Sequence, residues 1–302
     1  MGPFTDARLA AAVSNAGALG SIGAANRTPD ALTAEIERMR ELTNRPFVVN
    51  HLVSNLDRDA FSLTLEMKVP IVSFALGDPS ELVQLAHDAG ALVIQQVHTV
   101  AQARQAAGRG VDVVIAQGGE AGGFGQHVGA LALVPQVVDA VHPIPVLAAG
   151  GIADGRGLAA SLVLGAQGVN LGTRFLASVE APIGDGYKKA ILAAQSEQTT
   201  KVEVWNDFMP APGRGGYGTV PRAIRTPFIE SWEGRRVEAS MSSDQLRSEV
   251  MTAAQQGRFH EYVPFAGQSV GLIQDILPAA EIVKRIVTEA QLILAAAHKF
   301  TV

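Results

Sequence analysis

The amino-acid sequence predicts an α/β protein in which a parallel β-sheet closes into a barrel. Short, continuously apolar runs alternate with amphipathic stretches about every 20 to 35 residues through the first two thirds of the chain. Continuous apolar runs are typical of parallel strands that are buried on both faces. The last two runs also end in glycine-rich turns, which is where barrels of this kind commonly hold a phosphate group.

Seven of these runs are predicted to be strands, at residues 19–25, 47–52, 71–76, 92–97, 111–117, 146–149 and 168–171. Each leads into a stretch that predicts a helix, at residues 28–42, 58–68, 79–89, 100–108, 133–141, 156–164 and 183–195. The first of these helices opens on Thr28-Pro29-Asp30, a capping hydroxyl followed by a proline. Because every strand feeds a helix, a parallel sheet is the simplest arrangement.

Seven strands fit either a doubly wound sheet or a TIM-type (β/α)8 barrel, which needs eight. The sequence opens on Met1-Gly2-Pro3 and a helical stretch at residues 6–16, which resemble the loop and helix of a first βα unit. We therefore interpret the fold as a TIM-type (β/α)8 barrel whose first strand is apparently missing.

The strand–helix rhythm stops near residue 204. Residues 205–226 are rich in Pro, Gly and Arg, and residues 243–256 and 279–297 predict helices without intervening strands. We expect a barrel domain at residues 1–204 and a smaller, mostly helical subdomain at residues 205–302, with the last helix packing back on the barrel.

Composition excludes several classes of partner. The 302 residues are 47% apolar and 18% charged, the net charge is −5, and no dense basic patch suggests nucleic acid. The absence of cysteine excludes disulfides and thiolate chemistry and fits a cytoplasmic protein. Charges, Gly or Pro interrupt every apolar stretch before about 18 residues, so no membrane span is expected. No histidines have metal-ligand spacing, so no metal is predicted.

Two glycine-rich turns follow the last two predicted strands. Gly150 and Gly151 end one strand, and Gly172 and Thr173 follow the other. Glycine permits positive φ angles and close backbone approach, so that free N–H groups can face an anion. The helix after Gly151 adds its N-terminal dipole, and Thr173 adds a hydroxyl. These turns predict a phosphate cradle, and the alternative is that the glycines merely terminate strands.

A third glycine-rich segment follows the strand at residues 111–117. Residues 116–127 read AQGGEAGGFGQH, with five glycines, and carry Glu120, Gln126 and His127. Such a segment can pass close over a flat ligand, although a plain flexible loop is the alternative.

These motifs together resemble the nitronate monooxygenase family, formerly called 2-nitropropane dioxygenase, which includes a branch of flavin-dependent enoyl-ACP reductases. The likeness covers nearly the whole chain and rests on GGEAGG at 118–123, AAGGIADGR at 148–156, LGTRF at 171–175, FVVN at 47–50 and AGQSVGLI at 266–273. It implies non-covalent FMN in the barrel mouth and the oxidation of alkyl nitronates to carbonyl compounds and nitrite with oxygen.

The resemblance also implies which residues bind the cofactor. Gly122 and Gly123 match the loop over the flavin ring, and the two strand-end turns match the phosphate cradle. Asn50 matches a polar residue at the end of the third barrel strand, and Gln96 matches one that contacts the ring. Gln95 is an alternative to Gln96, because only one of two successive strand residues points inward. The full set of expected cofactor contacts is Met1, Gly2, Asn50, Gln96, Gly122, Gly123, Gly150, Gly151, Gly172 and Thr173.

One position departs from the family pattern. The family typically has a histidine, its presumed catalytic base, directly after the double glycine, where this chain has Phe124. His127 is the nearest replacement and is our candidate catalytic residue. His51 and His98, which also follow strands, are weaker candidates.

Three other functions remain open at this point. An NAD(P)H-dependent flavin reductase of quinones or enoyl thioesters is the first, although no nicotinamide fingerprint is present. A non-flavin barrel that binds a phosphorylated ligand, as an isomerase or synthase, is the second. A flavin-binding protein without catalysis is the third. In each enzymatic case the partner is a small molecule.

Overall fold

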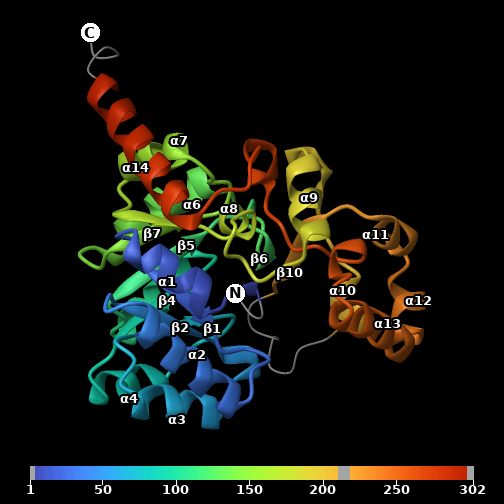
Figure 1. Cartoon of the computed structure of the whole chain (residues 1–302), viewed down its shortest axis with the longest axis horizontal. Coiled ribbons are helices and arrows are strands. Elements are labelled where there is room, and N and C mark those ends of the chain that lie inside the picture. Colours follow the sequence, from blue (N-terminus) through green and yellow to red (C-terminus); the bar gives the residue numbers. More distant parts are fainter. Residues whose placement is uncertain (1–3, 210–217, 298–302) are drawn as a thin grey trace.

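The structure, a computed structural model, describes residues 4–209 and 218–297. Its central feature is a curled sheet in which every neighbouring pair of strands is parallel (Figure 1). In spatial order the strands are β1 (Gly20–Gly23), β2 (Phe47–Leu52), β3 (Ile71–Ala75), β4 (Leu92–Val97), β5 (Val113–Gln117), β7 (Val146–Ala149) and β8 (Gly168–Asn170). This confirms the TIM-type fold with seven strands. Within the described residues, β1 and β8 each pair with one strand of this sheet.

The helices predicted for this part of the chain are present, with ends that differ from the predictions by at most three residues, whereas the short helix α8 after β8 was not predicted. They are α1 (Ala7–Asn15), α2 (Pro29–Leu42), α3 (Arg58–Glu66), α4 (Leu82–Asp88), α5 (Val100–Gly108), α6 (Ala130–Val141), α7 (Gly155–Val163), α8 (Thr173–Leu176) and α9 (Asp185–Ala193). Short 3₁₀ turns lie at Val53–Asn55, Ser196–Gln198, Phe259–Glu261 and Gln268–Leu272.

Side-chain caps explain where several of these helices begin. Asp6 accepts a hydrogen bond from Leu9 N at the start of α1, and Asp57 accepts two from backbone amides at the start of α3. Thr28 and Thr99 cap α2 and α5 in the same way. Each cap satisfies an amide that the helix itself leaves unpaired, which contributes about 1 kcal/mol.

The C-terminal part is mostly helical, as expected, but it also contributes a strand that the sequence did not predict. Its helices are α10 (Trp205–Phe208), α11 (Pro227–Trp232), α12 (Arg236–Met241), α13 (Ser243–Gln255) and α14 (Ala279–Ala296). A small antiparallel sheet joins β6 (Gly123–Gly125), β10 (Val220–Ile224) and β9 (Thr199–Lys201), with β10 in the middle. This sheet ties the glycine-rich loop after β5 to the C-terminal part.

Helix α14 runs back along the barrel beside α7 (Figure 1). The two helices approach so closely that a Cβ atom on Gly155 would lie 2.5 Å from Ala290 N. Glu289 of α14 accepts a hydrogen bond from Gly155 N at 2.7 Å. A glycine at this crossing is therefore required by contact rather than by backbone conformation.

Candidate functional site

The inside of the curled sheet changes from apolar to polar along the strands. Val48 and Ile94 belong to a buried cluster inside the sheet. Asn50 and Gln96 lie two residues further along the same strands, and Gln117 occupies the corresponding place on β5. Residues two apart on a strand share a face. Three carboxamides thus lie above an apolar floor at the carboxyl ends of the strands, which is the end where TIM barrels carry active sites.

A cavity of about 530 Å³ opens at this end of the sheet. That volume is in the range of cofactor and substrate sites. It brings together every predicted cofactor contact that the structure describes, namely Asn50, Gln96, Gly122, Gly123, Gly150, Gly151, Gly172 and Thr173. Met1 and Gly2 lie outside the described residues.

The lining of the cavity has a distinctive chemistry. Among the described residues, none of those that line it is Asp, Glu, Lys, Arg or His. Its polar groups are carboxamides, hydroxyls and backbone amides. Substrate chemistry in this cavity therefore has no described ionisable side chain to exchange a proton with directly.

The backbone after β7 and β8 is arranged to receive an anion. Gly150 and Gly151 have φ angles of +99° and +73°, which L side chains rarely adopt. A Cβ on Gly150 would also lie 2.9 Å from Gly118 O, whereas the space beside Gly172 is open for 4 Å. Among the described residues we find no acceptor for the backbone amides of Gly150, Gly151 and Gly172. These donors fit a bound phosphate group.

One expected part of this cradle is used otherwise. The sequence predicted that the N-terminus of α7 faces the anion, but Asp154 accepts hydrogen bonds from Arg156 N and Gly157 N there. The first amide of the helix, Gly155 N, donates to the carboxylate of Glu289. The first turn of α7 is therefore already satisfied, and the available donors come from the glycine turns themselves.

A segment far along the chain completes the cavity. Gly267 N donates to the hydroxyl oxygen of Thr173 at 2.9 Å, and Gln268 N donates to Glu120 O at 2.9 Å. A Cβ on Gly122 would lie 2.6 Å from Ala266 C, so a side chain there would push the two segments apart. The Thr173 hydroxyl accepts one bond and keeps its proton to donate. Ser21 Oγ, which is buried in the cavity lining, has no partner among the described residues.

Phe124 lies in an aromatic cluster beside the cavity. Its ring centroid is 5.7 Å from that of Phe265 and 6.3 Å from that of Trp205. Both Phe124 and Phe265 line the cavity. The carbonyl of Phe124 accepts a hydrogen bond from Gln117 Nε2 at 2.8 Å. The position at which the family has histidine is thus part of an apolar wall.

Sequence reasoning missed Gln117, although a signal was present. It ends β5 in the position that Asn50 and Gln96 hold on their strands, so strand alternation alone points it inward. The same alternation decides between the two glutamines of β4. Gln96 lines the cavity, whereas Gln95 is buried on the other side and its Nε2 donates to Gly77 O at 3.3 Å.

The candidate histidines lie away from the cavity lining. His127 is exposed and does not line it, so a catalytic role for His127 stays a prediction that requires the loop to move. His98 is buried, and burial lowers its pKa to about 4. His51 is also buried, with its pKa lowered to about 4 by burial, and its Nε2 lies 3.1 Å from Thr64 Oγ1.

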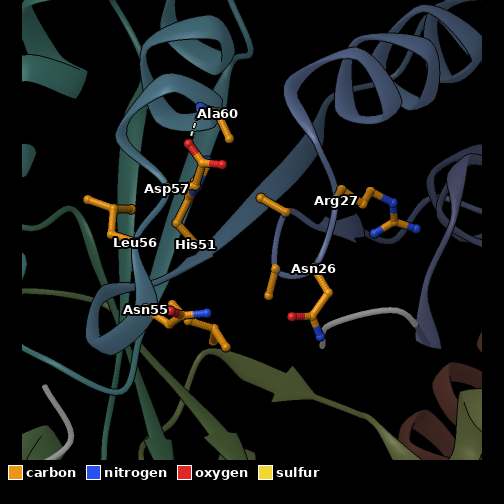
Figure 2. A pocket seen from close by; sticks show the side chains of 10 residues that line it. Asn26, Arg27, His51, Asn55, Leu56, Asp57 and Ala60 are labelled. Atoms are coloured by element: carbon orange, nitrogen blue, oxygen red, sulfur yellow. Dashed lines mark hydrogen bonds between the residues drawn. The ribbon is translucent and has the colours of Figure 1, made fainter. Parts of the chain in front are cut away.

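A second cavity of about 350 Å³ lies beside the first, between the loops after β1 and β2 (Figure 2). The two cavities share Ala25, Asn26, Leu52 and Asn55 in their linings. Figure 2 shows Asn26 and Asn55 facing each other across it. Arg27 points away, and its guanidinium donates to Thr5 O and Gly23 O.

The described residues contain no group of three or more His, Cys, Asp or Glu side chains placed to hold a metal ion. None of their helices combines the length and apolarity that crossing a bilayer requires.

Comparisons with known proteins point to one family. A sequence model of the family described as nitronate monooxygenase matches residues 1–61 and 57–289. The nitronate monooxygenase npaC of Metarhizium robertsii is 33% identical, over 96% of this chain and 89% of its own length.

Two other relatives carry different names. A (3aS,4S,5R,7aS)-5-hydroxy-7a-methyl-1-oxo-octahydro-1H-indene-4-carboxyl-CoA dehydrogenase of Mycobacterium tuberculosis is 39% identical over 77% of this chain, and the match spans 63% of that protein's length. The solved structure of FabK from Thermotoga maritima superposes with a TM-score of 0.90 at 35% identity, covering 99% of this chain and 93% of that one.

Proposed function

This chain belongs to the nitronate monooxygenase family, and from that premise we propose that it is an FMN-dependent oxidoreductase that converts alkyl nitronates to carbonyl compounds and nitrite with oxygen. The observation that carries the proposal is the absence of ionisable side chains from the described lining of the cavity. A nitronate is already an anion and can be oxidised without losing a proton, whereas a neutral nitroalkane needs a base. The site thus suits the nitronate.

The cavity fits FMN at both ends of that cofactor. The amides of Gly150, Gly151 and Gly172, which have no acceptor among the described residues, and the Thr173 hydroxyl would hold the phosphate. The carboxamides of Asn50 and Gln96 would contact the polar edge of the ring, above the apolar floor. Bound flavin supplies the electron transfer, which no side chain of this site can perform.

The remaining wall would position the substrate and exclude water. Phe124 and Phe265 form an apolar surface that cannot accept a proton. Gln117 holds the Phe124 carbonyl, which fixes the loop Gly122–Phe124 against the cavity. These residues favour a substrate whose carbon part is apolar and whose charge is already present.

Spectroscopy and anaerobic reduction test this proposal. The purified protein should show flavin absorption, and ethylnitronate should bleach it anaerobically while NADH and NADPH do not. With oxygen, nitrite should form from ethylnitronate. A colourless protein that takes up no added FMN would remove flavin chemistry and favour a phosphate-binding barrel of another class.

A second candidate is a flavin-dependent reaction of acyl thioesters coupled to NAD(P)H. It is favoured by the relative named as a CoA-thioester dehydrogenase and by the second cavity that joins the first. A long thioester could extend from one cavity into the other. Bleaching by NADH or NADPH but not by ethylnitronate would select this candidate.

A further inference from the structure

Lys201 reaches across the small antiparallel sheet to the glycine strand that borders the cavity. It lies on β9 opposite Arg222 of β10, and Val220 of β10 pairs with Gly125 of β6. Its ammonium group donates to Gly125 O at 3.0 Å and to Val220 O at 3.1 Å. One side chain thus holds all three strands together.

The ammonium group lies directly behind the cavity wall. A Cβ atom on Gly125 would lie 2.7 Å from Gln117 Nε2 and 3.6 Å from Lys201 Nζ, so both groups approach the same glycine. Gln117 lines the cavity and donates to the carbonyl of Phe124, which also lines it. Lys201 itself does not line the cavity, so its positive charge would act on a substrate through the wall that contains Gln117 and Phe124.

The surroundings leave this charge uncompensated by direct contact. Within the described part of the chain, Lys201 contacts carbonyl oxygens and forms no ion pair. Both carboxylate oxygens of Glu120 accept from Ala130 N instead. Arg222 adds a second cation, and its Nε donates to Gly119 O at 3.0 Å. Two cations thus lie in the small sheet beside a cavity whose described lining carries no charge, and the carboxylates of Glu203 and Glu120 act on Lys201 without an ion pair among the described residues.

We propose that Lys201 is a positioning residue for an anionic substrate: its partly buried ammonium group, held against Gly125, favours a negative charge beside Gln117 and Phe124. The identity of the anion as a nitronate rests on the proposed function, but the preference for an anion rests on the position of the Lys201 ammonium group beside Gly125. Where little bulk water lies between the two charges, a cation behind the wall changes the affinity for an anion roughly tenfold.

The titration of Lys201 makes this preference depend on pH. Burial, and then the positive charge of Arg222, lower the pKa of Lys201 to about 8, while Glu203 and Glu120 act in the opposite direction. His98, whose pKa is about 4, is neutral and adds no charge. Anion affinity should therefore be full below pH 8 and fall as the pH rises through that value, because the cation is lost.

Nitrate is a suitable probe because it is a planar anion that stays ionised from pH 6 to 10. Its dissociation constant would be measured by calorimetry on the flavin-loaded protein between pH 6.5 and 9.5. The wild type should bind nitrate roughly tenfold more weakly at pH 9.5 than at pH 6.5. Lys201→Met should show the weak affinity at every pH, and Lys201→Arg should stay tight throughout because guanidinium does not titrate there.

Lys188→Met is the matched control, because Lys188 is a buried lysine that, like Lys201, donates to a backbone carbonyl, here Val179 O, but lies on α9 and contacts no described strand of the small sheet. It should leave nitrate binding unchanged. Melting temperatures identify any variant that fails to fold, and Lys201→Gln then replaces it. Equal nitrate affinity of wild type and Lys201→Met at pH 6.5, or no nitrate binding to the wild type, would overturn the proposal.

The kcat/KM for ethylnitronate separates this inference from the proposed function. If nitrate binding follows the expected pattern but nitronate is not oxidised, the anion preference stands and the proposed reaction is wrong. If nitronate is oxidised with a kcat/KM that Lys201→Met leaves unchanged at pH 7, the reaction stands and the role of Lys201 is wrong.

Discussion

The two ends of the main cavity are built by opposite means. At one end, Gly150, Gly151 and Gly172 present backbone amides, and a side chain on Gly150 would lie 2.9 Å from Gly118 O. At the other end, the side chains of Gln117 and Phe124 line the cavity, and Lys201 lies behind them with its ammonium group on Gly125 O. If FMN binds as proposed, the first end would hold its phosphate through the backbone, whereas the side chains of the second end would set the preference for a substrate.

The largest expected effect tests the backbone end. Gly150→Ala forces a side chain into a backbone with φ of +99° and within 2.9 Å of Gly118 O. We expect FMN affinity to fall at least about a hundredfold, from the backbone strain and the displaced loop together. Fluorescence titration of the apoprotein with FMN measures it. Gly110→Ala is the control. Gly110 has φ of +83° and nothing within 4 Å of its Cβ position, so this variant introduces backbone strain without a steric clash.

Phe124→His tests the side-chain end by restoring the residue that the family typically has. A histidine there would supply the missing base, so kcat/KM for neutral nitroethane should rise about a hundredfold at pH 7. The value for ethylnitronate should change much less, because the anion needs no base. If the wild type already oxidised nitroethane well at pH 7 and the variant oxidised it no better, the site would not lack a base at position 124.

Acid should affect the side-chain end through His98, which lies behind β5 and interacts with the Gln117 backbone. Its folded pKa of about 4 is below the ordinary value of 6.5, so the unfolded chain binds the proton more readily. The stability it contributes is present above pH 6.5 and is lost as the pH falls toward 4. Urea unfolding should lose about 2 kcal/mol between pH 7 and pH 5 from this residue, and His98→Gln should remove that part of the loss.

Gln117→Met should have the smallest effect. The substitution keeps the side-chain length but removes the hydrogen bond to Phe124 O. A bond of this kind contributes about 1 kcal/mol, so kcat/KM for nitronate should fall roughly five- to tenfold. FMN affinity should stay unchanged, since the phosphate end is not touched. A large loss of FMN would show that the two ends are not independent.

Much of this architecture could be predicted because it depends on local sequence. The apolar runs placed the seven strands, and the caps Thr28 and Asp57 placed helix starts, since both signals act within one turn or one strand. The glycine pairs predicted the phosphate end for the same reason. Residues 220–224 escaped prediction, because this strand, with its internal Pro221, forms by pairing with β6 nearly a hundred residues away.

The sequence by itself determined the barrel, its glycine turns and the absence of a histidine at Phe124, because residue type and spacing settle backbone conformation and proton-transfer capacity directly. Only the tertiary structure decided that Gln96 rather than Gln95 lines the cavity, that α7 offers no free amides, and that Lys201 stands behind Phe124. Each of these three features depends on contacts between segments that are distant in the sequence. Electrostatic interactions depend on the distance between charges in space and not on their separation along the chain.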